Sequence, residues 1–406
     1  DGRVTAVNDK NDSGTATSDA FEIAANVWRP ATTGDTWSSA AWKKNGAGTA
    51  ALFNPLWATL FDGAETVKPA TVVVDAPFAT ERVTFNSAAD YTVSGTGVVT
   101  AKTLVKEGAG MLTLDSAAFA NTDDIEVRAG KLKIGNNATM GVLGKNDGVV
   151  TVKNGAQFEL NFASATSGMN QPRAALTNHK KFVIEGVGPD GKGALVNNTG
   201  LNTWSNPINE IELTGDATIG GTDRIDLRQD AGSSSKAWIH GGDDVTLTYG
   251  GSSYLNVSTA SHLDVGKVAV PPGATLLFDG TGSANVPHGI DLRGVMSFWG
   301  STGTFNLGED GTVVTGSEAR LEPLNGTSNY GAPLTVEAGA SVALKGSATL
   351  NYKGAVHNKG TMAQSSGTHQ FMGTLTNEGT INVTGGTFRP EYGSELVNIG
   401  NPLIQQ

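Results

Sequence analysis

The residues most capable of chemistry in this chain are acidic side chains between positions 223 and 264. Glycoside hydrolysis needs two carboxyl groups flanking one bond, one as general acid and the other as base or nucleophile. Neighbouring residues of a strand point to opposite faces, so such a pair would come from different turns of the chain. The candidates, which could line one groove, are Asp223, Asp226, Asp230, Asp243, Asp244 and Asp264. Alternatively, these residues cap turns, which Asp does routinely.

A second possible catalytic group is Asp12. The tetrapeptide Asp12-Ser13-Gly14-Thr15 matches the nucleophile motif of aspartic proteases, which use two carboxylates that share one proton. A second such motif is missing, and Asp230-Ala231-Gly232 is the nearest imitation. The sequence therefore leans away from catalysis. If the chain is an enzyme, we expect an acid-acting hydrolase that uses paired carboxylates.

The same N-terminal segment matches the first half of a calcium-binding loop. Asp9, Asn11 and Ser13 stand at alternate positions before Gly14, where such loops place their oxygen ligands. The acid that closes the loop is missing, because its position is Ala20. The other interpretation is a solvated turn. The chain has no cysteine and its six histidines lack metal-site spacing, so no other metal or cofactor is predicted.

Aromatic residues offer a different chemistry, because an exposed ring can stack on a sugar. Four tryptophans fall within thirty residues: Trp28, Trp37, Trp42 and Trp57. They form either an exposed platform for glycans or, as we favour, a cap that covers the apolar end of a stacked structure. The candidates for ligand contact are Trp28, Trp204 and Trp238.

The composition narrows the classes of function. The formal net charge is −11 and no dense Lys/Arg stripe is available to neutralise phosphates, which excludes nucleic acid as a partner. No apolar run approaches the roughly 20 residues that span a bilayer. No basic-then-apolar leader stands at the start of the sequence. We expect any signal or anchor to lie outside this chain.

The elements that would position these residues are short strands joined by glycine corners. The chain has 54 glycines in 406 residues, which indicates many tight turns. An eleven-residue pattern, h-x-V-x-x-G-x-x-h-x-h with h apolar, recurs at residues 150–160, 268–278 and 334–344. Each copy predicts two strands with alternating inward residues and a glycine at the corner. The recurrence predicts one continuous architecture.

A shorter repeat near the end of the chain predicts how the turns stack. Asn358-Lys359-Gly360-Thr361 recurs as Asn377-Glu378-Gly379-Thr380, nineteen residues later. One turn of a β-solenoid takes about 20 residues, so the second copy should lie on the first. We expect the Asn amides to bond turn to turn as a ladder.

Three segments resemble passenger regions of bacterial autotransporter-type proteins. Residues 186–197 read G-V-G-P-D-G-K-G-A-L-V-N, a glycine-rich corner between two strands. Residues 106–114 read K-E-G-A-G-M-L-T-L and are followed by V-R-A-G-K-L at 127–132, which resembles the autotransporter-associated β-strand repeat. Residues 211–221, I-E-L-T-G-D-A-T-I-G-G, resemble a third segment of the same family.

This resemblance covers residues 37 to 254 and implies a right-handed parallel β-helix displayed outside the cell. Together with the repeats, it predicts an all-β solenoid with an N-terminal cap region and flanking loops. We expect a Trp-rich cap over residues 1–65, a solenoid over 66–300 and its continuation over 301–406. Residues 164–181 and 301–329 have weak strand rhythm and are expected to be loops that carry contacts.

The resemblance implies no single activity. The leading hypothesis is a secreted or surface-displayed bacterial adhesin, monomeric in solution, that recognises host or matrix glycoprotein or glycan, including mucin. The alternative is a secreted hydrolase, a glycosidase or aspartic-type protease, that acts on mucin-type glycoprotein. A third hypothesis is a stiff stalk that presents another module.

Overall fold

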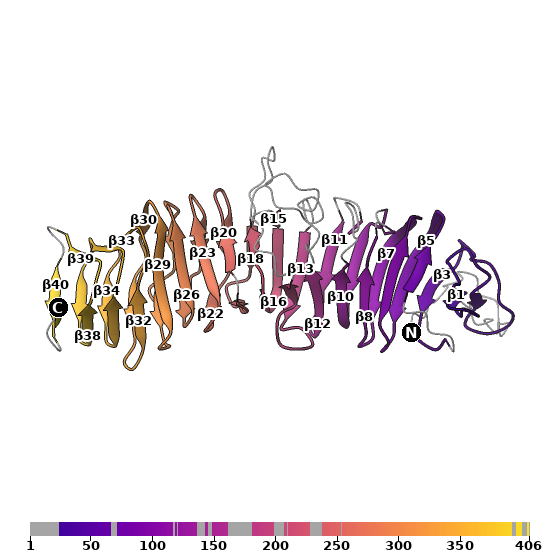
Figure 1. The fold of residues 1–406 in the computed structure, drawn as a ribbon, viewed down its shortest axis with the longest axis horizontal. Helices are drawn as coiled ribbons and strands as arrows, with labels where there is room; N and C mark the ends of the chain where they lie inside the picture. Colours follow the sequence, from indigo (N-terminus) through magenta and orange to yellow (C-terminus); the bar gives the residue numbers. More distant parts are fainter. Residues whose placement is uncertain are drawn as a thin grey trace, which may run out of the picture.

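The protein is an elongated β-solenoid in the computed structural model (Figure 1). The structure describes residues 24–65, 71–116, 118–119, 121–135, 143–144, 148–160, 181–198, 207–208, 210–227, 238–252, 254–391, 395–399 and 404–405. Within these ranges there are strands and turns but no helix, and the strands form about 13 turns of parallel, stacked sheets. Accordingly, no helix of this part of the chain has the length and apolarity to cross a bilayer.

Three ladders of parallel strands form the sides of the solenoid. We number them by the order in which each turn visits them. Ladder 1 contains β3 (Ala58–Phe61), β5 (Phe78–Asn86), β7 (Val99–Glu107), β9 (Asp124–Val127), β11 (Val149–Val152), β13 (Lys181–Gly186), β16 (Glu210–Gly221), β18 (Trp238–Gly241), β21 (His262–Asp264), β24 (Ser283–Asn285) and β27 (Phe305–Asn306). In the last four turns, the strand that comes first in each turn belongs to a separate sheet. This sheet contains β30 (Thr327–Tyr330), β33 (Thr349–Tyr352), β36 (Thr368–Phe371) and β39 (Thr387–Pro390).

Ladder 2 follows in each turn, and the second half of β16 belongs to it. Its other strands are β4 (Thr71–Val74), β6 (Tyr91–Gly95), β8 (Met111–Leu114), β10 (Gly130–Ile134), β12 (Ala156–Leu160), β14 (Leu195–Asn197), β19 (Thr246–Tyr249), β22 (Lys267–Val270), β25 (Ile290–Leu292), β28 (Thr312–Val314), β31 (Leu334–Val336), β34 (Val356–Asn358), β37 (Leu375–Asn377) and β40 (Leu396–Asn398). Every named strand pairing in ladders 1 and 2 is parallel.

Ladder 3 completes the turn and carries the candidate site. It contains β15 (Pro207–Ile208), β17 (Ile225–Leu227), β20 (Tyr254–Val257), β23 (Thr275–Asp279), β26 (Val295–Trp299), β29 (Ala319–Asn325), β32 (Ser341–Leu344), β35 (Thr361–Gln364), β38 (Thr380–Val383) and β41 (Ile404–Gln405). Strand pairings continue across residue 300, from β26 to β29 and from β25 to β28. The proposed division at that residue stays a prediction.

Side chains alternate between the core and the surface along each strand, as the eleven-residue pattern predicts. In β11, Val150 and Val152 point inward and pair in register with Phe182 and Ile184 of β13. Each copy of the pattern forms two consecutive strands: β11 and β12, β22 and β23, and β31 and β32. Their glycines, Gly155, Gly273 and Gly339, have φ of 81°, 84° and 81°, a region that favours glycine. The prediction of a glycine corner is confirmed.

The Asn ladder is also confirmed. Asn358 pairs with Asn377 in register, and its Nδ2 donates to Asn377 Oδ1 at 2.8 Å. Asn377 Nδ2 in turn donates to Asn398 Oδ1 at 2.9 Å. Asn358 and Asn377 are 0% and 1% exposed, so the hydrogen bond between these two amides lies inside the stack.

Lys106, which opens the autotransporter-like segment at 106–114, has a structural role. Lys106 is 2% exposed, and its Nζ donates to the carbonyls of Glu107, Gly108 and Ala129 at 2.7, 2.8 and 3.1 Å. Ala129 belongs to the next turn, so the ammonium joins two turns. A Cβ on Gly130 would lie 2.4 Å from Gly108 O and 2.8 Å from Lys106 Nζ. The spacing of lysine and glycine in this segment therefore follows from close packing between turns.

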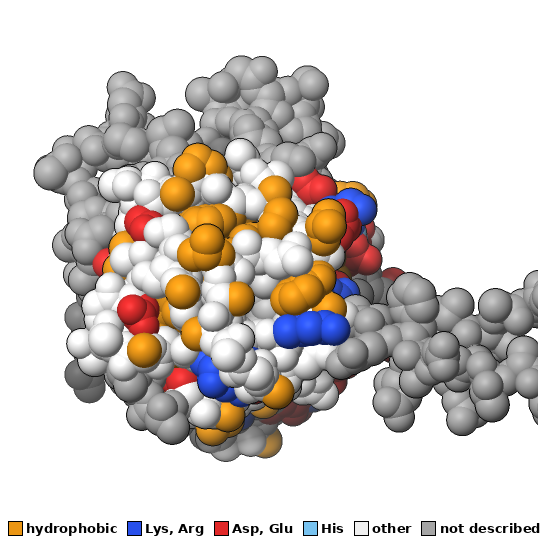
Figure 2. Space-filling model, turned by 90° about the vertical axis from the view of Figure 1, so that its right-hand side faces the viewer, with side chains coloured by type: hydrophobic (Ala, Val, Ile, Leu, Met, Phe, Trp, Pro, Cys, Tyr) orange, Lys and Arg blue, Asp and Glu red, His pale blue; other side chains and the backbone are white. Residues whose placement is uncertain are grey.

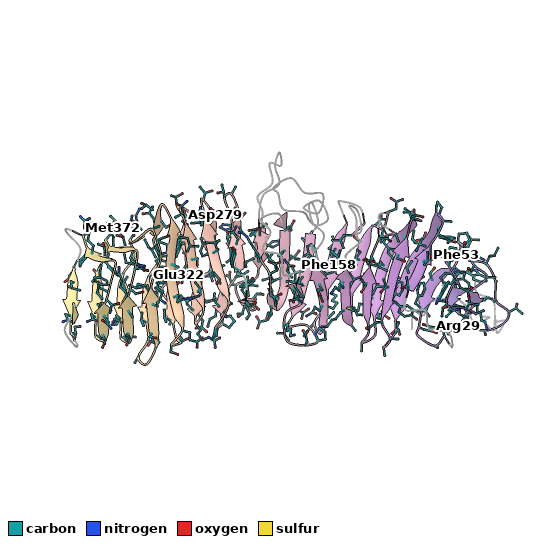
Figure 3. The ribbon with its side chains drawn as sticks, in the orientation of Figure 1. Arg29, Phe53, Phe158, Asp279, Glu322 and Met372 are labelled. Carbon is teal, nitrogen blue, oxygen red and sulfur yellow. The ribbon has the colours of Figure 1, made fainter. Side chains whose placement is uncertain are left out.

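An aromatic cluster covers the N-terminal end of the stack. β1 (Ala25–Trp28) and β2 (Trp42–Lys44) pair antiparallel, unlike the other named strand pairs. Trp28, Trp37 and Trp42 are at most 1% exposed, and Trp42 lies 4.9 Å from Trp28 and 5.1 Å from Trp37 between ring centroids. Figure 2 views this end, where uncharged and apolar side chains dominate and charged ones are few. An ion pair between Arg29 and Asp62, at 2.7 Å, lies at the same end (Figure 3).

The structure corrects the expectation of a loop over residues 301–329. This stretch forms β27, β28, β29 and the start of β30, a regular turn of the solenoid. Its rhythm is weak in sequence because its strands are short and β29 contains a bulge around Pro323. Of the other expected loop, at 164–181, residues 164–180 lie outside the described residues and Lys181 is the first residue of β13.

Candidate functional site

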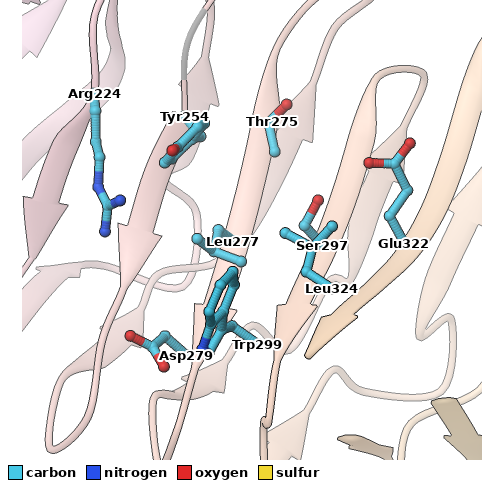
Figure 4. A pocket seen from close by; sticks show the side chains of 9 residues that line it. All are labelled: Arg224, Tyr254, Thr275, Leu277, Asp279, Ser297, Trp299, Glu322 and Leu324. Atoms are coloured by element: carbon cyan, nitrogen blue, oxygen red, sulfur yellow. The ribbon is translucent and has the colours of Figure 1, made fainter. Parts of the chain in front are cut away.

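A hollow of about 210 Å³ lies on the outer surface of ladder 3. Nine side chains line it, drawn in Figure 4: Arg224, Tyr254, Thr275, Leu277, Asp279, Ser297, Trp299, Glu322 and Leu324. They come from the β17 edge and from four successive strands, β20, β23, β26 and β29. Because the strands pair in register, their outward residues form rows across the face. The hollow is therefore a product of stacking, and no single turn contains it.

The floor of the hollow is one outward row that is nearly buried. Asn256, Leu277 and Ser297 are partners in register, with exposures of 2%, 6% and 3%. They point away from the core, so only the flanking rows can cover them. Leu277 and Ser297 of this row line the hollow between the larger side chains of Tyr254 and Trp299 in the flanking rows.

The walls are the two flanking rows. On one side Tyr254 pairs with Thr275, and on the other Asp279 pairs with Trp299. Trp299, the last residue of β26, is 40% exposed. In Figure 4 its ring stands beside Leu277 with Asp279 near its edge. The hollow thus combines one exposed indole with polar groups on both sides.

A β-bulge shapes the end of the hollow that lies on β29. Phe298 pairs with Pro323 whereas Trp299 pairs with Asn325, so Leu324 is an extra residue on β29. Bulges turn a side chain away from its regular direction and are common beside binding sites. Here the bulge adds Leu324 to the lining.

A buried ion pair lies at the opposite end of the hollow, beside β17. Arg224 Nε donates to Asp226 Oδ1 at 2.6 Å, and Asn256 Nδ2 donates to the same oxygen at 2.7 Å. The side chains of Arg224 and Asp226 are 6% and 1% exposed. The Arg224 guanidinium also lies 5.0 Å from the centre of the Tyr254 ring, within cation–π range. This network fixes the position of Tyr254.

The structure does not gather the acids that the sequence singled out. Asp223 and Asp226 are 2% and 0% exposed beside ladder 3, where Asp226 pairs with Arg224. Asp243 and Asp244 form an exposed turn between β18 and β19, at the corner between ladders 1 and 2. Asp264, on ladder 1, accepts from Asn285 Nδ2 at 2.7 Å. The described acids thus lie on different sides of the solenoid, Asp230 lies outside the described residues, and a catalytic role for this group stays a prediction.

The tryptophan candidates have different outcomes. Trp28, named as a candidate for ligand contact, is 0% exposed and packs within the aromatic cluster. Trp238 is 38% exposed on ladder 1 and stacks on His240, with ring centroids 4.0 Å apart. Trp204 lies outside the described residues, as do Asp9, Asn11, Asp12 and Ser13, so the calcium and protease hypotheses stay predictions.

Beside Trp238, charged side chains form a network on the outer face of ladder 1. Glu210, Glu212 and His240 bring three potential metal ligands within 4.8 Å of one another. Lys181 Nζ already lies 3.2 Å from Glu210 Oε1 and contacts Glu212. Burial opposes ionisation of Glu210, but hydrogen bonds from His240 and Lys181 outweigh it and lower its pKa. An ammonium already supplies the positive charge here, so the geometry assigns no metal.

Sequence reasoning missed four residues that line the hollow: Tyr254, Asp279, Trp299 and Glu322. A signal existed, because Tyr254 and Thr275 are 21 residues apart and Asp279 and Trp299 are 20 apart, close to one turn. Reading it requires the register of every strand pair, which the uneven turn lengths conceal.

The chain was compared with protein-family models, curated proteins and solved structures. None of these three comparisons gives a match.

Proposed function

We propose that this protein is a secreted or surface-displayed glycan-binding protein, an adhesin, that recognises host or matrix glycoprotein through the hollow on ladder 3. The observation that carries the proposal is the exposed indole of Trp299 beside the Leu277 floor and the Asp279 carboxylate. The apolar face of a sugar ring packs on an indole, and carboxylate, amide and hydroxyl groups around it bind the ring hydroxyls.

Recognition in such a hollow is weak for one site. Its volume of about 210 Å³ is below the roughly 300–1,000 Å³ of typical ligand pockets, so it holds a small unit. Display of many copies on one surface multiplies the strength of attachment. The stacked ladders supply a rigid frame, so little conformational entropy is lost when the ligand binds.

The competing proposal is a hydrolase of mucin-type glycoprotein. The two carboxyl groups lie about 5–5.5 Å apart in retaining glycosidases and about 6.5–9.5 Å apart in inverting ones. Asp279 and Glu322 lie two strands apart, on β23 and β29, so their backbones are separated by roughly 10 Å or more along the stack. Figure 4 shows the two carboxylates at opposite ends of the hollow. This arrangement favours binding over cleavage.

The test is incubation with mucin across about pH 4 to 8, scored for bound protein and for released fragments. We expect saturable binding without fragments, and at least tenfold weaker binding by Trp299→Ala. Met372→Ala, an exposed apolar residue on the C-terminal turns, is the matched control and should bind like the wild type. Fragments that disappear in Asp279→Asn or Glu322→Gln would replace the binding proposal with the hydrolase. Neither binding nor cleavage would favour the stalk.

A further inference from the structure

We propose that the hollow on ladder 3 selects uncharged sugar residues and rejects sialylated or sulfated ones. This inference rests on the proposed function and narrows its ligand class. Its basis is the set of charges that reach the hollow: the cation there is already held by a carboxylate, whereas two further carboxylates face the ligand.

The positive charge of Arg224 at the hollow is neutralised by Asp226. Arg224 is the only Lys or Arg among the nine lining residues. Its guanidinium is bound to Asp226 at 2.6 Å, and both side chains are almost completely buried. The remaining face of the guanidinium lies over the Tyr254 ring. An incoming anion would have to compete with Asp226 for a charge that the fold already uses.

The anionic side is neutralised only in part: Arg320, whose side chain is 45% exposed, pairs with Glu322, whereas Asp279 makes no ion pair within the described part of the chain. Asp279 and Glu322 both line the hollow. Asp279 accepts a long hydrogen bond from Ser258 Oγ at 3.5 Å, and Glu322 lies 3.2 Å from Arg320 Nε, with 20% of the Glu322 side chain exposed. Like charges brought together in a partly desolvated site repel, and this repulsion discriminates against the wrong partner. A sugar carboxylate or sulfate therefore meets the wrong sign of charge.

The separation of these carboxylates argues against a cationic ligand. One ammonium could pair with only one of them, because they lie at opposite ends of the hollow (Figure 4). A hydroxyl-bearing ring can instead donate to Asp279 at one end and to Glu322 at the other while its apolar face packs on Trp299. The hydroxyl groups of Thr275 and Ser297 provide shorter-range contacts along the same path. A neutral hexose or N-acetylhexosamine residue has this chemistry.

The experiment measures binding of matched oligosaccharide pairs by isothermal titration calorimetry and by saturation-transfer NMR. Each pair has a neutral terminal sugar with and without sialic acid or sulfate. We expect the neutral member to bind at least tenfold more tightly at about 50 mM salt. The difference should shrink at about 500 mM salt, because screening weakens repulsion between partly exposed charges.

Charge-neutral variants separate the contribution of repulsion from that of shape. Asp279→Asn and Glu322→Gln keep the size of each side chain, and we expect the preference for the neutral member to fall at least threefold in the double variant. Tighter binding of sialylated or sulfated glycans by the wild type would overturn the inference and leave a glycan-binding function intact. Absence of binding by every pair, with Trp299→Ala unchanged from wild type, would instead overturn the proposed function. Binding lost in Trp238→Ala but kept in Trp299→Ala would move the site to ladder 1 and also overturn the inference.

Discussion

The two ends of the solenoid are stabilised by different chemistry. At the N-terminal end, three tryptophans and Phe61 pack edge-to-face or tilted behind an antiparallel strand pair. In the C-terminal turns the interior instead carries buried polar side chains, among them Asn358 and Asn377 of the Asn ladder and His369 bonded to Tyr352. Aromatic packing gains free energy from burial in any orientation that fits, whereas a buried amide ladder is stable only when every partner is present. Loss of one buried ring should cost more free energy than loss of one ladder amide, because the ring removes more buried area and leaves a larger cavity.

The largest effect is expected from removing one ring of the N-terminal cluster. Trp37→Ala deletes a side chain that is 0% exposed, which costs about 3–5 kcal/mol through lost burial and the cavity left behind. Because turns of a solenoid unfold semi-independently, the loss should appear locally, as faster hydrogen exchange in β3 and β5. Trp238→Ala, on an exposed ring, is the control and should change exchange little. Equal effects of the two variants would contradict the role of the cluster as a cap.

The next effect is a dependence of the C-terminal turns on pH. Burial lowers the pKa of His369 to about 4, so the folded protein holds it neutral: its Nδ1 accepts from Tyr352 OH at 2.9 Å. As pH falls, the unfolded chain takes up a proton near pH 6.5 and the folded chain only near 4. Stability contributed by this group is therefore complete above about pH 6.5 and is lost progressively down to about pH 4, on the order of 3 kcal/mol at most.

Hydrogen exchange of β33 and β36 between pH 7 and 4, corrected for intrinsic rates, measures this dependence. His369→Gln removes the titrating group and should flatten the profile over that interval. His288→Gln, on an exposed residue, should leave it unchanged. A wild-type profile that stays flat would show that His369 does not couple protonation to the stability of these turns.

A smaller effect is expected within the Asn ladder. Asn377→Ala removes one of the two acceptors of Asn358 Nδ2, which keeps Thr380 O at 3.0 Å, and removes the donor to Asn398, so one buried N–H group loses its acceptor. The expected cost is about 1–3 kcal/mol, seen as loss of exchange protection in β34 and β37. A cost comparable to that of an exposed residue would mean that solvent replaces the ladder.

The smallest effect provides the matched comparison. Asn306 Nδ2 donates to Asn285 Oδ1 at 2.6 Å in a second, exposed ladder on the outside of the solenoid. Asn306→Ala should change stability by only about 0.5 kcal/mol, because water can replace the lost donor. Chemical denaturation of the two Asn variants side by side tests whether burial, and not the hydrogen bond itself, sets the cost. Equal costs would refute that explanation.

The sequence predicted the frame better than the site. Glycine corners and the nineteen-residue Asn repeat depend on local geometry and on one turn stacking on the next, so they were visible in the pattern. Exposure of single residues was not: Trp28 and Trp299 both close a short strand, yet one ring is fully buried and the other 40% exposed. Which side of a strand faces the core near the end of a stack depends on neighbours that a single turn does not contain.

The hollow escaped prediction because its residues meet only through register. Turns differ in length, with partners 21 residues apart from Leu104 to Ile125 but 32 apart from Val150 to Phe182. An error of one residue exchanges the inner and outer faces of a strand. The bulge at Leu324 adds a further shift that no repeat pattern indicates.

The stacking of turns along the long axis also determines how the molecule would respond to a pulling force. The hydrogen bonds between turns run along that axis, so tension applied at the two ends would load them one turn at a time (Figure 1). A turn of 21 residues, such as that from Leu104 to Ile125, occupies about 4.8 Å of the stack but spans about 70 Å when extended. Pulled at both ends, such a stack would lengthen one turn at a time and dissipate mechanical energy at each step.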